Sequence, residues 1–237
     1  MDKIDSLTII FPVYNEEKRL KKLFKSIKFF EKKYFKLFVI FVDDGSKDKS
    51  QIKIKEFIKS ENNKRFKLII NKYNEGKGFS LKRGIKLTKT NWILTSDVDL
   101  SVEIKQVLIW FNKKYIDRNI NIYWGSRSHK LSKLKTSLLR VYLGHIFKFL
   151  LRLLFDINNN DTQCGFKLYN KNIKNLFSHL KLRGFSHDVE IFLICKKLKH
   201  NIKFLPVKWE HKKNSKVNLF SLIKMFFELI NLKLRYF

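Results

Sequence analysis

Two carboxylates one residue apart, Asp97 and Asp99, follow the apolar segment 92–95 and are the side chains most suited to chemistry. Mg²⁺ and Mn²⁺ prefer hard oxygen ligands and are usually held by one or two carboxylates together with substrate phosphates and water. The pair therefore predicts a metal site that a phosphorylated ligand completes. The same residues also fit an exposed turn, so their position relative to other polar residues has to decide between the two interpretations.

Other polar residues that suit a nucleotide follow two further apolar segments. Asp43 and Asp44 come after residues 37–42, and their carboxylates can accept hydrogen bonds from a nucleobase N–H and from ribose hydroxyls. Lys77 stands between two glycines after residues 66–70, where backbone N–H groups and one cation can approach phosphates. Both sequences are also common as turns before a helix. The Lys77 sequence is not a P-loop, because it lacks the Gly-Lys-Ser/Thr ending.

The elements that must position these residues alternate between strand and helix. The predicted strands are 7–11, 37–42, 66–70, 92–95 and 120–126, and the predicted helices between them are 16–30, 48–58, 79–87 and 103–114. This alternation predicts an α/β fold with a mostly parallel central sheet flanked by helices. Ligands of such sheets bind beyond the carboxyl ends of the strands, where all four aspartates lie. Arg127 follows the last predicted strand, and its guanidinium can pair with a phosphate.

Composition limits the class of protein. At 237 residues and 44% hydrophobic, the chain can form one domain with a substantial core. Its two cysteines, Cys164 and Cys195, predict reduced thiols, neither a disulfide framework nor a zinc site. Scattered lysines supply most of the net charge of +30, which suits a diffuse contact with an acidic surface better than nucleic-acid readout. We recognise no secretory signal and expect a cytoplasmic chain that starts at Met1.

Two segments in the C-terminal half are predicted amphipathic helices. Residues 136–156 carry a polar side chain, such as Arg140, at about every fourth position, and residues 218–237 repeat the pattern. The longest uninterrupted apolar run has six residues, whereas a helix that spans a bilayer needs about 20 mostly apolar ones. The helices fit the interface of a membrane. Packing on the sheet or in a dimer contact explains the pattern as well, and the two interpretations are compatible.

Seven short sequences in a fixed order resemble glycosyltransferase family 2, and specifically its dolichyl-phosphate β-glucosyltransferase-like branch. They are Pro12-Val13-Tyr14-Asn15-Glu16, Asp43-Asp44-Gly45-Ser46, Asn74-x-Gly76-Lys77-Gly78, Asp97-Val98-Asp99-Leu100-Ser101, Gly125-Ser126-Arg127, Asp161-Thr162-Gln163-Cys164-Gly165-Phe166-Lys167 and Asp188-Val189-Glu190. The resemblance covers about residues 7–217, and the segment 161–167 is the part most specific to the branch. Trp209-x-His211 and Ser215-Lys216-Val217 also look like this branch.

The resemblance implies a GT-A fold in residues 1–217, a UDP- or GDP-sugar donor, bound Mg²⁺ or Mn²⁺, and a polyprenyl-phosphate acceptor. The residues expected to bind the nucleotide-sugar are Pro12, Tyr14, Glu16, Asp43, Asp44, Lys77, Asp97 and Arg127, with Asp97 and Asp99 as metal ligands. The residues expected around the acceptor are Arg140, Asp161, Gln163, Lys167 and Glu190. The expected catalytic residues are Asp99, Arg127 and Asp188.

The role of Asp188 depends on the acceptor. Asp188 matches the general base of relatives that glycosylate hydroxyl groups, because a hydroxyl must lose its proton as it attacks. A phosphate monoester has a second pKa of about 6 and is already largely ionised at neutral pH. For a phosphate acceptor we therefore expect Asp188, with Glu190, to position the acceptor or a basic partner.

These inferences predict an inverting hexosyltransferase that moves glucose from UDP-glucose onto a polyprenyl phosphate. We expect peripheral association with the inner face of the cell membrane, in part through residues 218–237, and no nucleic-acid partner. One alternative is a family 2 enzyme that acts on a soluble or glycan hydroxyl, with Asp188 as general base. A more remote alternative is a non-catalytic basic module that binds membranes or nucleic acid.

Overall fold

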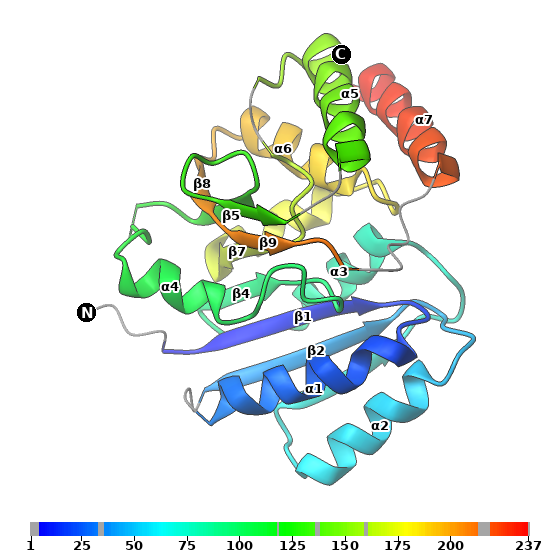
Figure 1. Cartoon of the computed structure of the whole chain (residues 1–237), viewed down its shortest axis with the longest axis vertical. Coiled ribbons are helices and arrows are strands. Elements are labelled where there is room, and N and C mark those ends of the chain that lie inside the picture. The colour runs from blue at the N-terminus through cyan, green and yellow to red at the C-terminus, as the bar shows by residue number, and fades with distance from the viewer. Residues whose placement is uncertain are drawn as a thin grey trace.

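A computed structural model describes residues 5–32, 36–117, 119–135, 138–158, 161–212 and 219–236. Its centre is a seven-stranded sheet in the order β3-β2-β1-β4-β7-β5-β8, with a small second sheet of β6 and β9 (Figure 1). The strands are β1 (Leu7–Val13), β2 (Leu37–Asp43), β3 (Phe66–Ile70), β4 (Trp92–Thr95), β5 (Ile122–Ser126), β6 (Lys133–Lys135), β7 (Lys167–Asn170), β8 (Ile202–Pro206) and β9 (Lys208–Glu210). In the large sheet only β7 runs antiparallel to its neighbours, so the predicted mostly parallel sheet is confirmed.

Helices cover both faces of the large sheet. They are α1 (Glu17–Glu31), α2 (Ser50–Glu61), α3 (Lys77–Lys86), α4 (Gln106–Asn112), α5 (Leu138–Phe155), α6 (His187–Lys197) and α7 (Leu219–Tyr236), with a 3₁₀ segment η1 (Lys171–His179). Alternate residues of β1 point to opposite faces, as expected of a strand. Ile9 and Phe11 belong to the core that α1, α2 and α4 cover, whereas Ile10 belongs to the core that α3, η1 and α6 cover.

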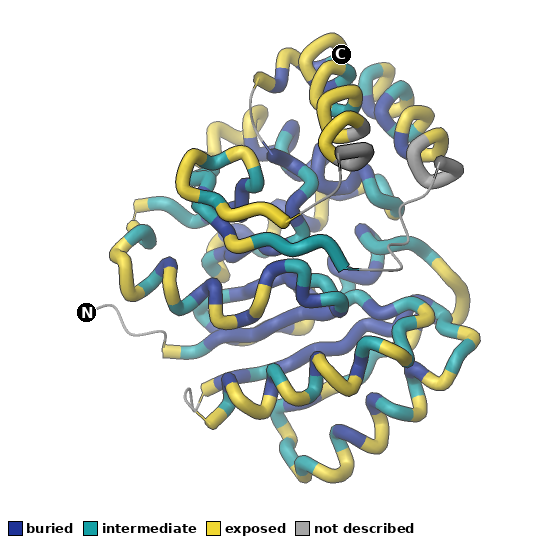
Figure 2. Tube along the Cα trace, viewed as in Figure 1, coloured by how far each residue is buried: buried dark blue, intermediate teal, exposed yellow. Residues whose placement is uncertain are grey.

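Helices α5, α6 and α7 form a third apolar cluster beside the sheet. Leu151 and Phe155 of α5, Val189 of α6, and Leu229 and Leu232 of α7 are all buried together. Figure 2 shows α5 and α7 side by side, with buried residues on their inner faces and exposed residues outside. Both helices therefore have the predicted amphipathic character and pack through one face.

Two sequence-based expectations about this region fall outside the described residues. The expected division between residues 217 and 218 lies outside the described residues, as does the side chain of Arg140. Within the described part of the chain, no helix combines the length and the apolar character needed to cross a bilayer.

The sheet topology brings the polar segments to one edge. Val13, Asp43 and Ile70 are register partners at the carboxyl ends of β1, β2 and β3. The segment after β4 lies beside β1, because the Ser96 N–H donates to the Ile10 carbonyl at 3.1 Å. The parallel strands thus place the turns after β1, β2, β3 and β4 next to one another, where the site is found.

Candidate active site

Asp43 ends β2 and presents one carboxylate oxygen without a partner. Its side chain is fully buried, and Oδ1 accepts hydrogen bonds from the Ser46 N–H at 2.9 Å and from Gln51 Nε2 at 2.8 Å. Oδ2 is buried and has no hydrogen-bond partner among the described residues. A buried carboxylate oxygen left unpaired is costly, so this atom is suited to a donor group of a ligand such as a nucleobase N–H.

The Asp44 carboxylate is engaged by the protein on both of its oxygens. Its carboxylate accepts hydrogen bonds from Asn71 Nδ2 at 2.7 Å, from the Glu75 N–H at 3.0 Å and from the Gly76 N–H at 2.8 Å. Gly76 has a φ of 101°, and a Cβ there would lie 2.3 Å from the Arg183 carbonyl oxygen. Asp44 therefore fixes the glycine turn before Lys77, and its direct contact with a nucleotide stays a prediction.

The turn after β1 lies against the turn after β2. Pro12 and Tyr14 are half-buried at this edge, and the Glu16 N–H donates to Ser50 Oγ at 2.8 Å. The Glu16 carboxylate binds Arg19 in the first turn of α1 at 2.9 Å. The structure thus brings Pro12, Tyr14 and Glu16 to the carboxyl edge of the sheet. The Glu16 carboxylate is already paired with the Arg19 guanidinium.

Lys77 forms an ion pair with the first of the two carboxylates that follow β4. The Lys77 Nζ lies 2.6 Å from Asp97 Oδ1. Burial alone would lower the pKa of Lys77, but the charges of Asp97, Asp188 and Asp99 outweigh burial and raise the pKa above its ordinary value. Asp99 Oδ1 accepts the Ser101 N–H at 2.8 Å, which fixes the orientation of this second carboxylate. The geometry shows that a cation is favoured beside Asp97.

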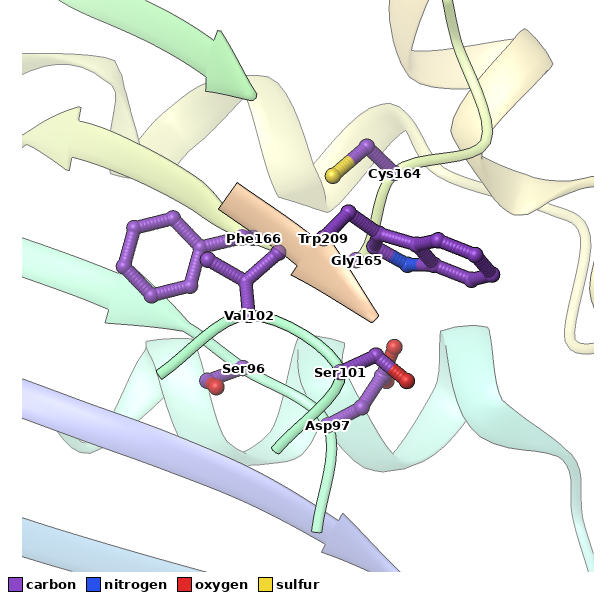
Figure 3. Close-up of a pocket in the computed structure, with 8 residues that line it drawn as sticks. All are labelled: Ser96, Asp97, Ser101, Val102, Cys164, Gly165, Phe166 and Trp209. Atoms are coloured by element: carbon purple, nitrogen blue, oxygen red, sulfur yellow. The ribbon is translucent and has the colours of Figure 1, made fainter. Parts of the chain in front are cut away.

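The oxygen donors of Asp97 and Asp99 fit a divalent cation that arrives with its ligand. Asp97 keeps 40% of its side chain exposed, and a Cβ on Gly165 would lie 2.3 Å from Asp97 Oδ2. Among the described residues, no group of three or more acidic, histidine or cysteine side chains surrounds them. The protein thus offers too few ligands to complete a coordination shell, and phosphate oxygens would have to complete it. Figure 3 shows the pocket beside Asp97, which is lined by Ser96, Asp97, Ser101, Val102, Cys164, Gly165, Phe166 and Trp209.

Arg127 and Asp161 form a two-pronged ion pair at the end of β5. Arg127 Nε and Nη2 donate to Asp161 Oδ2 and Oδ1, both at 2.8 Å, and the guanidinium lies 5.6 Å from the Trp209 ring centroid. Burial alone would raise the pKa of Asp161, but Arg127 lowers it below its ordinary value. Arg127 keeps 34% of its side chain exposed, so a phosphate can reach it. Gln163 Nε2 next to this pair is buried and has no partner among the described residues.

Asp188 is a buried counter-ion. Lys167 is also buried and forms an ion pair with Asp188, donates to the Thr162 carbonyl at 2.9 Å and lies 3.8 Å from the Trp124 ring centroid. His187 Nε2 lies 3.0 Å from Asp188 Oδ1. Burial alone would raise the pKa of Asp188, but His187 and Lys167 lower it well below its ordinary value. A carboxylate held in its ionised form in this way is a weak proton acceptor.

Glu190 binds the backbone of the segment that leads into α6. It is fully buried, and its Oε2 accepts the Lys181 N–H at 3.0 Å and the Leu182 N–H at 2.6 Å. The Tyr236 hydroxyl donates to Glu190 Oε1 at 3.1 Å. Glu190 therefore shapes the segment before α6, and any effect on an acceptor is transmitted through that backbone.

Several residues of the site were not found by sequence reasoning. In the sequence, Trp209 stands out only as part of a family-like motif, although it lines the pocket and faces Arg127. His187 and Ser186 precede the Asp188 sequence directly, but nothing in the local pattern indicated that they are almost completely buried. Contacts between segments far apart in the chain decide these roles, and periodicity does not report such contacts.

The Asp188–Lys167 pair leads to a prediction about stability. Replacing Asp188 with Asn leaves the Lys167 ammonium buried and unpaired, so the free energy of unfolding at pH 7 should fall by about 3 kcal/mol. Because the pKa of Asp188 is lowered in the folded state, its contribution is present above the unfolded pKa of about 4 and is lost as the pH falls through and below that value. Urea unfolding from neutral to acidic pH should therefore show a weaker loss of stability on acidification in D188N than in the wild type.

The exposed acid Asp5 offers a matched control for that measurement. D5N should follow the wild-type curve at every pH. A D188N protein as stable as the wild type at pH 7 would show that Lys167 does not depend on this carboxylate.

Comparisons with known proteins agree with this geometry. The model of Glycosyl transferase family 2 matches residues 8–177. The dolichyl-phosphate beta-glucosyltransferase of Dictyostelium discoideum is 32% identical over 97% of this chain and 74% of that protein. The protein of the same name from Homo sapiens is 30% identical over 97% of this chain and 75% of its own length.

Solved structures show the same fold. Glucosyl-3-phosphoglycerate synthase from Mycobacterium tuberculosis, solved with Mn²⁺, UDP-glucose and phosphoglyceric acid, superposes with a TM-score of 0.70 at 16% identity. The superposition covers 98% of this chain and 79% of that one. At this identity the likeness is one of fold, and it confirms the predicted α/β architecture of the GT-A type. The family model and the curated relatives establish that the chain belongs to glycosyl transferase family 2.

Proposed function

We propose that this chain transfers glucose from UDP-glucose to the phosphate of a polyprenyl phosphate, with inversion at the anomeric carbon. The observation that carries the proposal is the ion-paired Asp188. Its charge is already matched by Lys167 and its pKa is lowered, so the site has no ready base at the position where a hydroxyl acceptor would need one. A phosphate acceptor is largely ionised at neutral pH and needs no such base. The printed names of the curated relatives, which are dolichyl-phosphate glucosyltransferases, support the same acceptor class.

The donor side supplies binding and charge stabilisation. Asp43 Oδ2 can accept a nucleobase N–H, while Lys77 and Arg127 can neutralise the diphosphate. Asp97 and Asp99 would hold Mg²⁺ or Mn²⁺, which when bound supplies a Lewis acid for the departing diphosphate. Solved neighbours with Mn²⁺ and UDP support the use of a divalent metal in this fold.

The transfer is a single displacement. An oxygen of the acceptor phosphate attacks the anomeric carbon as the bond from that carbon to the diphosphate oxygen breaks on the opposite face. The electron pair of the broken bond leaves with UDP, whose added charge Lys77 and Arg127 stabilise. Asp188 does not accept a proton in this sequence, because the acceptor already carries the attacking oxygen as an anion. It holds Lys167 and the start of α6 in place.

We further propose that α5 and α7 rest on the membrane surface that contains the acceptor. Tyr142, Phe149 and Leu153 of α5 and Phe227 and Leu234 of α7 are large apolar side chains that are at least 64% exposed. Exposed basic residues accompany them, namely Lys148 and Arg152 of α5 and Lys224 and Arg235 of α7. An apolar face flanked by cations is typical of helices that lie in the interface of an anionic bilayer.

The acceptor assignment predicts a selective transfer. With radiolabelled UDP-glucose and Mn²⁺, the protein should glucosylate a polyprenyl phosphate but neither the matching polyprenol, which lacks the phosphate, nor free sugars. The product should have the β configuration, because one displacement inverts the α-linked donor. Transfer to the polyprenol or to a sugar at a comparable rate would instead favour the hydroxyl-acceptor alternative.

The metal assignment predicts the effect of one isosteric substitution. Asp99→Asn removes a charge from the metal site while keeping the side-chain shape, so kcat/KM should fall by about 100-fold or more. The circular dichroism spectrum and thermal midpoint should stay close to those of the wild type, because Asp99 is only half-buried. EDTA should stop transfer by the wild type, and added Mn²⁺ should restore it. Undiminished activity in EDTA would refute the metal role.

The membrane proposal predicts the behaviour of a double variant. Phe149→Glu with Phe227→Glu places charges on the proposed lipid-facing surface, and its affinity for vesicles of phosphatidylcholine and phosphatidylglycerol should fall at least about tenfold. Phe29→Glu on α1, at the other end of the molecule (Figure 1), changes an aromatic residue that is 57% exposed, and this variant should bind as the wild type does. Equal sedimentation with vesicles by the wild type, the double variant and F29E would contradict the assignment of this surface.

A further inference from the structure

Helix α7 contacts the segment before α6 through the Glu228 carboxylate. Glu228 Oε2 accepts the Ser186 N–H at 2.9 Å. Ser186 is fully buried and is the N-cap residue of α6, and its Oγ donates to the Met225 carbonyl of α7 at 3.3 Å. The first residue before α6 is thus held on both its backbone and its side chain by the C-terminal helix.

Gly184 provides the space that this contact requires. A Cβ at Gly184 would lie 1.9 Å from Glu228 Oε1. A methyl group at this position could not coexist with the observed carboxylate position, and the flexible Glu228 side chain would have to move away. The observed position of the Glu228 carboxylate therefore requires a glycine at residue 184.

The segment held by Glu228 borders the donor side of the site. The Arg183 carbonyl accepts the N–H groups of Gly78 at 2.7 Å and Phe79 at 3.3 Å in the first turn of α3. These residues directly follow Lys77, whose ammonium lies 2.6 Å from Asp97. Only two residues, Gly184 and Phe185, thus separate the contact of Arg183 with α3 from the contact between Ser186 and Glu228.

The same segment leads into the acceptor side. Two residues after Ser186 comes Asp188, which pairs with the buried Lys167. The imidazole of His187 lies between these positions, with Nδ1 at 2.8 Å from the Gly184 carbonyl and Nε2 at 3.0 Å from Asp188 Oδ1. A shift of this backbone would therefore move the Lys77 turn and the Asp188 carboxylate together.

We propose that Glu228 is a positioning residue of the transfer reaction. Its carboxylate fixes residues 183–186, and this segment in turn sets the Lys77 turn for the donor diphosphate and Asp188 for the acceptor. The donor part of this inference depends only on nucleotide binding, whereas the acceptor part rests on the function proposed above. Neither part requires Glu228 to touch a substrate.

The test compares Glu228→Ala, Glu228→Gln and, as control, Asn231→Ala at an exposed position one turn further along α7. Calorimetric titration with UDP and Mn²⁺, without acceptor, should show binding about tenfold weaker in E228A. Transfer should lose kcat by roughly 10- to 100-fold, because small misplacements of reacting groups are costly. E228Q should stay close to the wild type, since its amide oxygen can still accept the Ser186 N–H. N231A should be unchanged.

A purely structural role would give another result. Loss of stability lowers the thermal midpoint but leaves the Kd of the folded protein for UDP unchanged at temperatures well below that midpoint. If the folded E228A protein binds UDP as tightly as the N231A protein does, the proposal is overturned. An E228Q protein as impaired as E228A would also overturn it, because the hydrogen bond to Ser186 would then not explain the effect.

Gly184→Ala gives a second test that leaves Glu228 in the chain. The added methyl group should displace the carboxylate and reproduce the weaker UDP binding of E228A. The double variant G184A/E228A should be no worse than either single one, since both remove the same contact. Additive effects on UDP affinity would contradict the proposal. A wild-type protein that binds UDP but does not glucosylate polyprenyl phosphate would refute the proposed acceptor while these UDP titrations still decide the role of Glu228.

Discussion

The buried ammonium of Lys167 is the constraint on which the site depends. Lys167 begins β7 between Thr95 of β4 and Trp124 of β5, in the middle of the sheet, and it is 1% exposed. Burial lowers the pKa of Lys167, so its charged form needs an opposite charge in direct contact. Asp188 gives most of that compensation, and the Thr162 carbonyl and the Trp124 ring add to it. The pair therefore ties the first turn of α6 to the start of β7.

This pairing determines which chemistry the site can support. A carboxylate that neutralises Lys167 and faces His187 has its ionised form strongly favoured, so it is a poor recipient for the proton of a sugar hydroxyl. The neighbouring cations Lys77 and Arg127 suit phosphates on both the leaving and the attacking group. An acceptor that arrives already ionised satisfies both conditions at once, and a neutral hydroxyl acceptor satisfies neither.

The sequence predicted those parts of the fold that local pattern encodes. The apolar segments that became β1 to β5, and the helices between them, are continuous and strongly periodic, so their type and order were predicted correctly. Strand β7 was not predicted, because it has four residues, starts with Lys167 and pairs antiparallel with segments far away in the chain. The amphipathic pattern of α5 and α7 predicted their two faces, but only the structure shows that α6 lies under them.

The candidate site, like the fold, was only partly predictable from the sequence. Residue type and position after a strand singled out Asp97, Asp99 and Arg127 before the resemblance to a family assigned their roles, and the structure brings them to the predicted edge. What the residues do for one another depends on contacts across long sequence separations, such as Arg127 with Asp161. Asp44 illustrates the difference: its position predicts a contact with a nucleotide, and only the structure shows that it also accepts the Glu75 and Gly76 N–H groups and so fixes the Lys77 turn.

Helix α7 joins two requirements that the proposed reaction imposes on one chain. A lipid acceptor must be met at a bilayer surface, while a nucleotide-sugar must be held in a polar pocket. Phe227 is 66% exposed, whereas the adjacent Glu228 turns inward to the Ser186 N–H. Successive helical residues differ by about 100° in direction, so one short stretch of helix can face lipid and hold the site at the same time. Together the two proposals link the position of α7 on the membrane to the geometry of the Lys77 turn, through the contacts of Glu228 and Met225 with Ser186.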